Sequence, residues 1–381
     1  MDMKIRNWII ALFCSLFMSV WANDGVYLVN GNHLVPLNET DISIEKEVLT
    51  ISLGDDGFAS VDVRYVFFNN ANDKVVLMGF EADAPYNDLA AITRSFRHPY
   101  IEDFTVVMNG EKLSFENALV AVNNGDTDFK PLDLNRWKAT KDEDFAQSDR
   151  LYDAENDSII TFAYAYYFKA NFKKGRNEVH HTYRYRMSYG VARTFEVPYW
   201  LTPAMRWANH QIDDFTLRIK AENTSKHFCF DNSLFAVAPF TISEGQGKMR
   251  TTTHYEEKLL EVSLRNGTLE WHATQFKPTE NLRIYSADYL YAFSEQEKIG
   301  SFYDRNEHYF PIWKMGIDFK HNKEARRILR NLPYASRGYV FTKKDMKEYF
   351  NQLWWYMPDP SWQVSTDDFT SRERKWINED Y

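Results

Sequence analysis

The stretch NETDISIEKEVLTISLGDDGFASVDVRYVFFNN, Asn38 to Asn70, decides the fold class of this chain. Apolar and polar residues alternate along both of its halves. A period of two residues is typical of strands that bury one face. Gly54 to Gly57 lies between the halves and is rich in turn-forming residues. The stretch therefore predicts two antiparallel strands, each with one face packed inward.

The same alternation recurs further along the chain, in KVVLMGFEAD, DFTVVMNGEKLSFE, SIITFAYAYYFKANF and RNEVHHTYRYRMSYG. The pairs Asn109–Gly110 and Asn266–Gly267 lie between alternating segments, where such a pair predicts a hairpin turn. No helix-length pattern alternates with the strands, which argues against a doubly wound α/β fold. We therefore expect a mainly β protein of antiparallel β-sandwich domains, with a small helical module at its C-terminal end.

The first residues resemble an export signal. Lys4 and Arg6 precede the apolar run WIIALFCSLFMSV, which ends in VWA before polar residues. Such a charged start, short apolar run and small-residue end indicate a signal peptide at 1–22, cleaved after Ala22. The run is too short to span a bilayer, although it could also be a buried N-terminal helix. We expect an exported protein, periplasmic or extracellular, with no transmembrane segment after cleavage.

Charge and cysteine content narrow the functional classes. The chain has a net charge of −9, which becomes −10 when residues 1–22 are removed. Nothing in this balance suggests nucleic acid as a partner. Cys229 would then be the only cysteine, so no internal disulfide could form. Within HFCFDNSLF it is expected to be a buried thiol on a strand; the alternative is a reactive thiol beside His227.

Candidate metal and catalytic residues give weak signals. Asp126 and Asp128 lie in an acidic stretch, but Lys130 occupies the place of the next oxygen ligand of a calcium loop. His180 and His181 are adjacent, so on a strand they point to opposite faces and are poor partners for one metal ion. No glycine-rich phosphate loop or nucleophile elbow is found. We expect no metal and no cofactor, and the catalytic residues, if any, are unknown.

Near Gly316 the period changes, because KHNKEARRILRNL places its apolar residues three and four apart, as in an amphipathic helix. RNLPYASRGYVF (330–341), WWYMPDPSW (354–362) and FTSRERKWI (369–377) follow. This ordered set resembles the YARHG domain, a module of secreted and membrane-attached bacterial proteins, over about residues 318–381. The matching positions are Tyr334, Ala335, Ser336, Arg337, Gly338, Phe341, Trp355, Tyr356 and Pro358.

Departures from the family pattern affect the local structure. Ser336 replaces the family's arginine and Arg337 replaces its histidine. Pro333 is expected to break the lead-in helix near Asn331, and Gly338 to adopt the left-handed conformation that ends it. Thr342 is expected to cap a second helix whose inner face is Met346, Tyr349, Phe350 and Leu353. A third helix should begin at Thr370.

A second resemblance covers the N-terminal part. Asn38–Asn70 together with YWLTPAMRWANHQIDDFTLRI (199–219) is similar to an uncharacterised family of secreted bacterial β-sandwich proteins. Trp200, Pro203 and Trp207 predict a loop or helical turn that bridges two β layers. The expected domains are a signal peptide (1–22), a β-sandwich (23–205) with an acidic, short-helical insertion at about 123–158, a second β-rich region (206–316) and the YARHG-like module (317–381).

The aromatic residues of the last sixty positions can be explained in two ways. Large rings build a small core without disulfides, or they line a groove that binds sugars. Basic residues are also concentrated between Lys320 and Lys347. The candidate binding residues for an anionic or glycan envelope polymer, or for another envelope protein, are Arg326, Arg327, Arg337, Trp354 and Trp362.

Two functional classes follow from these observations. The first is a non-enzymatic cell-envelope protein with a β scaffold and a C-terminal recognition or docking module. The second is an envelope hydrolase that acts on a glycan or peptidoglycan through two carboxylates far apart in the chain. The lack of any catalytic motif favours the first class.

Overall fold

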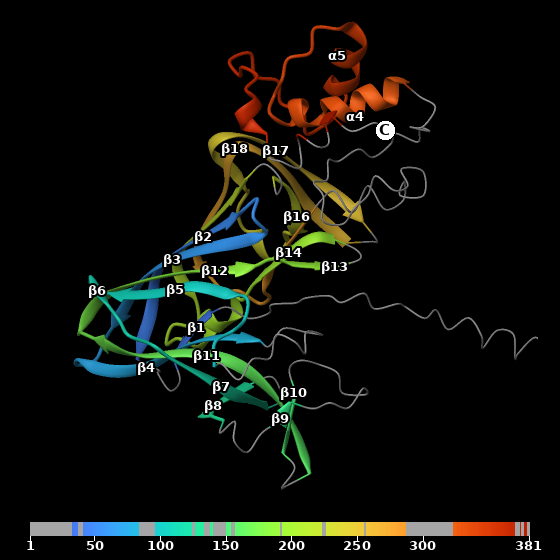
Figure 1. Cartoon of the computed structure of the whole chain (residues 1–381). Coiled ribbons are helices and arrows are strands. Elements are labelled where there is room, and N and C mark those ends of the chain that lie inside the picture. Colours follow the sequence, from blue (N-terminus) through green and yellow to red (C-terminus); the bar gives the residue numbers. More distant parts are fainter. Residues whose placement is uncertain are drawn as a thin grey trace, which may run out of the picture.

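A computed structural model describes residues 33–36, 41–83, 96–123, 126–132, 138–139, 150–153, 157–190, 193–222, 226–254, 257–286, 323–369, 374 and 377–378. The predicted signal peptide, its cleavage site and the start of the predicted third helix at Thr370 lie outside these residues. The fold is mainly β, with two sheets and a helical C-terminal module (Figure 1).

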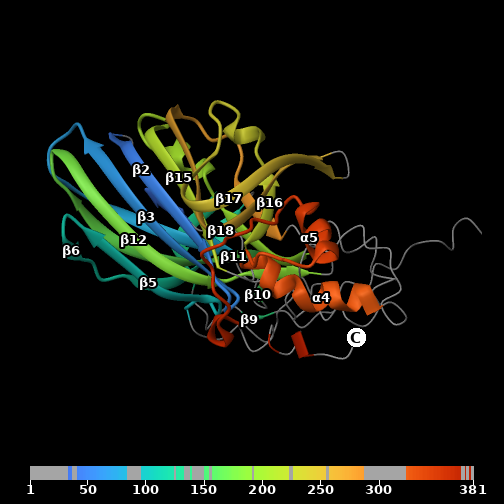
Figure 2. The same ribbon diagram turned by 90° about the horizontal axis from the view of Figure 1, so that it is seen from above.

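The larger sheet contains twelve strands in the order β13-β14-β19-β16-β18-β15-β2-β3-β12-β5-β6, with β17 paired to β18. Its strands are β2 (Ile42–Leu53), β3 (Phe58–Asn69), β5 (Ile101–Met108), β6 (Glu111–Lys112), β12 (Gly175–Arg186), β13 (Ser188–Gly190), β14 (Arg193–Tyr199), β15 (Ile212–Ala221), β16 (His227–Asp231), β17 (Thr241–His254), β18 (Glu257–Phe276) and β19 (Leu282–Ser286). Figure 2 shows β15, β2, β3, β12 and β5 side by side.

The smaller sheet contains seven strands. They are β1 (His33–Pro36), β4 (Lys74–Asp83), β7 (Glu116–Asn123), β8 (Asp126–Pro131), β9 (Lys138–Ala139), β10 (Arg150–Asp153) and β11 (Ser158–Phe172). The predicted insertion at about 123–158 therefore contributes short strands, β8 to β10, where short helices were expected. That prediction was wrong for the described residues, because β8 pairs with β7, β10 pairs with β11, and β9 pairs with β10.

The alternation in Asn38–Asn70 forms the predicted antiparallel pair, β2 with β3. Gly57 closes the turn between them with φ 82°. Asn109 and Gly110 form the predicted hairpin, with φ 51° and 85°. The hairpin predicted at Asn266–Gly267 was wrong: Asn266 has the expected positive φ, 54°, yet β18 runs through it. The extra residues are absorbed as a bulge against β17.

The two sheets pack face to face around one aromatic core. Phe80 and Tyr166 of the smaller sheet and Phe104 and His181 of the larger sheet contact one another there. His181 is fully buried whereas His180 faces outward and pairs with Asp62 at 2.9 Å, as expected of neighbours on a strand.

The bridging turn is a 3-10 helix, η2 (Thr202–Arg206). Trp207 follows it and is 1% exposed. Its ring lies 4.4 Å from that of Phe67 in the larger sheet and 6.5 Å from that of Phe172 in the smaller one. The predicted helical turn between two β layers is confirmed.

The second β region continues the first. β15 pairs with β2 in parallel, and residues from both regions share one hydrophobic core. The predicted boundary at 205/206 therefore runs through a continuous sheet. Cys229 lies in β16 and is fully buried, as predicted.

The module comprises α4 (Lys323–Ser336), α5 (Lys344–Asn351) and a 3-10 turn, η6 (Thr366–Asp368). The expected break near Asn331 was wrong, since α4 continues through Pro333 to Ser336. The Asn331 side chain donates to the Arg327 carbonyl at 2.7 Å, within the same helix. Thr342 is not the cap of α5; Lys343 occupies that position without a side-chain cap bond.

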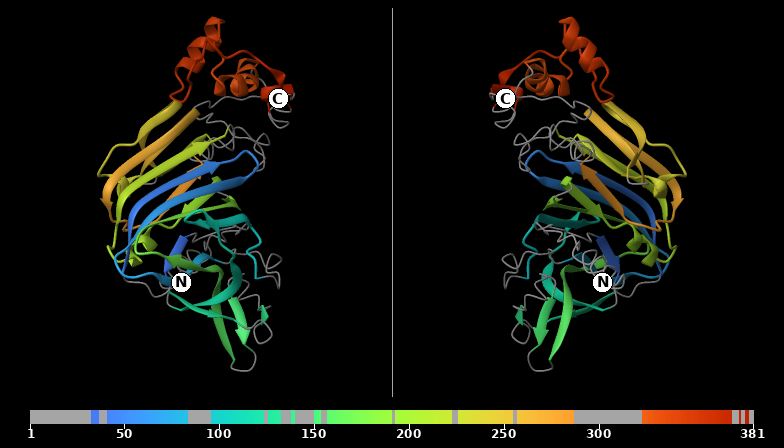
Figure 3. Two further views of the ribbon diagram at one scale, coloured as in Figure 1. Left: turned by 90° about the vertical axis from the view of Figure 1, so that its left-hand side faces the viewer. Right: turned by 90° about the vertical axis from the view of Figure 1, so that its right-hand side faces the viewer.

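Gly338 ends α4 as predicted, with φ 87°. The Tyr339 amide donates to the Tyr334 carbonyl at 3.0 Å and the Gly338 amide to the Ala335 carbonyl at 3.0 Å. This pair of bonds is the Schellman motif, which satisfies carbonyls at a helix end. Figure 3 shows the module at one end of the molecule and the short strands around β10 at the other.

Candidate docking site of the C-terminal module

The module lies over β17 and β18 (Figure 1). Side chains alternate along these strands and along β16, so each has an inner and an outer face. The inner residues belong to the sandwich core: Phe228, Phe230, Leu260, Val262 and Leu264. The outer face, which we call the docking face, consists of His227, Gln246, Lys248, Arg250, Glu261, Ser263 and Arg265, with Lys226 just before β16.

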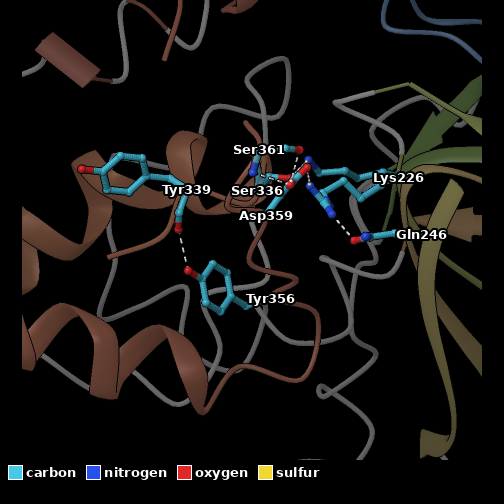
Figure 4. A network of polar contacts seen from close by, with 8 residues as sticks. Lys226, Gln246, Ser336, Tyr339, Tyr356, Asp359 and Ser361 are labelled. Carbon is cyan, nitrogen blue, oxygen red and sulfur yellow. Dashed lines mark hydrogen bonds and ion pairs between the residues drawn. The ribbon is translucent and has the colours of Figure 1, made fainter. Parts of the chain in front are cut away.

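Three cationic side chains of the docking face bind the module: Lys226, Lys248 and Arg265. Figure 4 shows Lys226 and Gln246 on the side of the sandwich, facing Ser336, Asp359 and Ser361 of the module. Lys226 Nζ donates to the Ser336 carbonyl at 2.7 Å, and Lys248 Nζ donates to the Tyr356 carbonyl at 2.8 Å. Ser336 is the last residue of α4, where a carbonyl has no partner within the helix and a cation is favoured by the helix dipole. Lys226 therefore caps α4 from the sandwich.

The third cation is Arg265. Its guanidinium pairs with the Asp359 carboxylate at 2.6 Å and also donates to the Gln246 side chain. Ser361 donates to the same carboxylate from its hydroxyl, at 2.5 Å, and from its amide, at 2.9 Å. These contacts hold the pKa of Asp359 down, to about 2, with the Ser361 bond first and the Arg265 bond second. Asp359 is thus a fixed anion facing Arg265.

Gly338 lies against this ion pair. A Cβ added at this residue would lie 2.7 Å from Arg265 Nη1 and 2.7 Å from the Met357 carbonyl oxygen. The Asp359 amide also donates to the Gly338 carbonyl at 2.7 Å. The motif glycine is therefore needed twice, for its positive φ and for the close approach of the sandwich.

Two tryptophans extend the contact. Trp355 is 1% exposed, and its ring meets that of His227 edge-on at 5.3 Å. The Arg250 guanidinium lies 4.5 Å above the Trp354 ring, within the range of a cation–π interaction, and Arg250 Nε donates to Glu261 at 2.6 Å. Trp354, a candidate for sugar stacking, thus has one face against the sandwich.

Arg337 points into the module. It is 7% exposed, donates to the carbonyls of Asp368 and Pro333, and lies 4.6 Å above the Phe369 ring. Arg327 pairs with Asp345 of α5 at 2.5 Å. These contacts tie segments of the module together. Arg326 lies in α4, and its side chain is outside the described part of the structure.

Most rings of the motif form the module's own core. Phe341 stacks on Phe350 at 4.3 Å, and both are buried with Trp355 and Tyr356. The Tyr356 hydroxyl donates to the Tyr339 carbonyl. Tyr334 packs edge-on against Phe369. Ala335 is buried and belongs to the module core. Of the two explanations for the aromatic residues, core or sugar-binding groove, the core explanation is confirmed for Tyr356, which is buried in the module.

Some predicted positions remain at the surface. Pro358 is exposed, and Trp362 is half-buried with its ring 6.4 Å from that of Tyr339. Lys343, Lys344 and Lys347 at the start of α5 are exposed, with Lys344 88% exposed at its side chain. The structure thus separates the basic residues into those that hold the fold and those that face solvent.

The sequence reading missed Lys226, Lys248, Arg265 and Asp359. One signal was available: TISEGQGKMRTTTH (241–254) has the length of a strand but few apolar residues on either face. A strand that lies next to a core and still has a polar outer face can indicate a docked polar partner.

Two family models match separate parts of the chain. Residues 318–379 match the YARHG domain, and residues 22–158 match a domain of unknown function, DUF4424. The C-terminal module is a YARHG domain, a type of module that is typically extracytoplasmic. A search of curated proteins gives no significant match.

Solved structures show more distant likeness. A candidate nutrient-binding protein from Legionella pneumophila is 19% identical, with a TM-score of 0.48, and the match covers 93% of this chain and 99% of that one. An M1 zinc metallopeptidase from Deinococcus radiodurans is 12% identical, with a TM-score of 0.25, over 66% of this chain and 43% of that one. Similarity at this level carries no functional argument.

The described residues lack two further features. No described helix is both long enough and apolar enough to cross a membrane. Within the same residues, no three His, Cys, Asp or Glu side chains are placed together as metal ligands.

Proposed function

We propose that this protein is a non-enzymatic extracytoplasmic scaffold that holds its YARHG domain in a fixed orientation, as a recognition module for an anionic envelope polymer or an acidic envelope protein. The observation that carries the proposal is the docking face. Its cations bind two carbonyls and one carboxylate of the module, and the motif residues Ser336 and Gly338 lie at the contact. A module oriented in this way presents one constant surface to a partner.

The presented surface is basic. With Arg327 and Arg337 used inside the module, the cations that face solvent near α5 are Lys343, Lys344 and Lys347. Lys344 lies 3.9 Å from Glu348, a weak surface pair. Exposed lysines on a flexible stem suit an anionic polymer better than a shaped small molecule. Trp362 lies half-buried on the same module and could add a stacking contact.

Binding of the full chain to immobilised dextran sulfate, with neutral dextran as reference, tests this proposal. The variant Lys343→Gln/Lys344→Gln/Lys347→Gln should lose most retention, and its remaining binding should depend less on salt because fewer charges are screened. A matched control replaces three exposed lysines of the sandwich, Lys112, Lys169 and Lys174. Equal loss in both variants would mean that only net charge matters and would refute recognition by the module.

A further inference from the structure

An open hollow lies at the ends of β2 and β3, where the chain leaves the larger sheet for the smaller one; in the sheet order β2 is separated from β18 by β15. It encloses about 570 Å³ and is lined by Asp41, Ser43, Phe68, Asn70, Ala71, Ala208 and Asn209. Ser43 and Phe68 are opposite each other in the β2–β3 register, on the outer face of the sheet. The volume falls within the range of small-ligand sites, about 300 to 1,000 Å³.

The walls of the hollow are built from tightly bonded backbone. The buried Asn69 side chain donates to the Asn72 carbonyl at 3.0 Å and accepts from the Ala71 amide at 3.0 Å, which fixes the turn that carries Asn70. Opposite it, the Asn209 side chain bonds both the amide and the carbonyl of Ile44, like an added strand residue. These bonds hold the lining in place before any ligand arrives, which lowers the entropy cost of binding.

The chemistry of the lining favours a neutral polyhydroxylated ligand. Among the described residues of the lining Asp41 is the single charged one, and its carboxylate pairs with Lys74 Nζ at 3.1 Å, so these residues offer no excess charge to an ion. Asn70 and Ser43 supply an amide and a hydroxyl, which both donate and accept. Phe68 adds a half-buried ring whose face can lie on the C–H face of a sugar.

We infer that this hollow is a binding site for a neutral sugar unit, with Phe68 as the stacking surface and Asn70, Ser43 and Asp41 as hydrogen-bonding groups. The site is independent of the lysine surface on the YARHG domain. One protein would then contact an envelope glycan through the sandwich and an anionic partner through the module.

Saturation-transfer NMR on the full chain tests the inference, with glucose, galactose, N-acetylglucosamine and their β-linked disaccharides as probes at millimolar concentration. At least one probe should receive saturation, and its affinity should fall about tenfold or more in Phe68→Ala and in Asn70→Ala. Because Phe68 is half-buried, Asn70→Ala is the decisive variant: it removes an exposed side chain and should leave thermal unfolding unchanged.

The matched control is Phe96→Ala, which removes a 41% exposed ring outside the hollow and should leave sugar binding unchanged. The lysine triple variant should also bind the sugar normally, which separates this inference from the proposed function. Absence of saturation transfer to every probe would overturn the inference, and so would full binding by both Phe68→Ala and Asn70→Ala.

Discussion

The β-sandwich and the YARHG domain both bury aromatic rings, but they bury polar groups differently. In the sandwich, His181 is fully buried among Tyr65, Phe80, Phe104 and Tyr183, and its ring nitrogens have no hydrogen-bond partner among the described residues. In the module, the buried Arg337 is bonded to carbonyl oxygens. A large core can tolerate an unsatisfied polar ring, because its many apolar contacts offset the cost.

The small module has fewer apolar contacts to offset such a cost. A unit of about sixty residues buries so little apolar surface that it is only marginally stable alone. Its eight-residue core is completed from outside, by His227 against Trp355 and by Lys226 at the end of α4. The difference suggests that the sandwich is stable by itself and that the module depends on docking.

The largest expected effect is in the module core. Tyr356→Ala removes a 4% exposed ring and its hydroxyl bond, and should cost about 3 to 5 kcal/mol. Trp354→Ala should cost less, because that ring is only half-buried and its contact is with Arg250. Limited proteolysis should show Tyr356→Ala cut within the module while the sandwich resists. If both variants kept wild-type resistance, the assignment of these rings to core would be wrong.

The next effect concerns pH and the sandwich core. Burial raises the pKa of Glu47 from 4.5 to about 8, and burial lowers the pKa of His181 from 6.5 to about 3. The folded protein therefore holds the Glu47 proton more tightly than the unfolded chain does, and stability falls as pH rises from 4.5 to 8. For His181 the sign is opposite, and stability falls as pH drops from 6.5 to 3.

Between pH 4.5 and 6.5 the two slopes cancel, so stability should be nearly flat there. Above pH 6.5 Glu47 acts alone, with a slope of about 1.4 kcal/mol per pH unit. Glu47→Gln should remove this loss, as measured by urea unfolding at pH 5.5 and pH 8. Glu178→Gln, at an exposed position of β12, is the control. A wild-type slope in Glu47→Gln would show that another group causes the alkaline loss.

Much of the fold could be predicted from the sequence, and each wrong prediction has a physical cause. Period-two alternation predicted β2 and β3, and the YARHG motif predicted Gly338 as the end of α4, because both signals are local. The hairpin predicted at Asn266–Gly267 was wrong because a positive φ is compatible with a bulge as well as with a hairpin turn. Which of the two forms depends on the pairing of β18 with β17 along its length. The break expected at Pro333 did not occur, since a proline removes only its own amide donor and α4 continues for just three residues beyond it, to Ser336.

The docking face could not be predicted from the sequence, for a different reason. Of its cations, Lys248 and Arg265 lie on β17 and β18 and Lys226 lies just before β16, and two of the three acceptors are backbone carbonyls, which every residue has. No residue spacing in the chain encodes such a contact. The same holds for Glu47, whose burial follows from a register shift between Ile44 and Lys46 that puts an acidic residue on the inner face of β2.

Two glycines with nearly equal φ separate strain from close packing. Gly110 has φ 85° and open space around its added Cβ, whereas Gly338 has φ 87° and would clash with Arg265 and with the Met357 carbonyl. Gly110→Ala should cost about 1 kcal/mol from strain alone. Gly338→Ala should cost about 1 to 2 kcal/mol more, as measured by urea unfolding, because the module must shift from the docking face. Equal costs would mean that the module does not press on Arg265.

The smallest expected effect belongs to the ion pair itself. Ser361 donates to the Asp359 carboxylate from its hydroxyl and its amide, so two hydrogen bonds to that carboxylate would remain in Arg265→Gln. A double-mutant cycle of Arg265→Gln and Asp359→Asn should therefore give a favourable coupling smaller than the cost of Gly338→Ala. Because the lowered pKa keeps Asp359 charged down to about pH 2, the coupling should be the same at pH 5 and pH 8 and should weaken with added salt. A coupling of zero at low salt would mean that the carbonyl contacts of Lys226 and Lys248 hold the module alone, and that the sandwich recognises the shape of the YARHG backbone more than its charge.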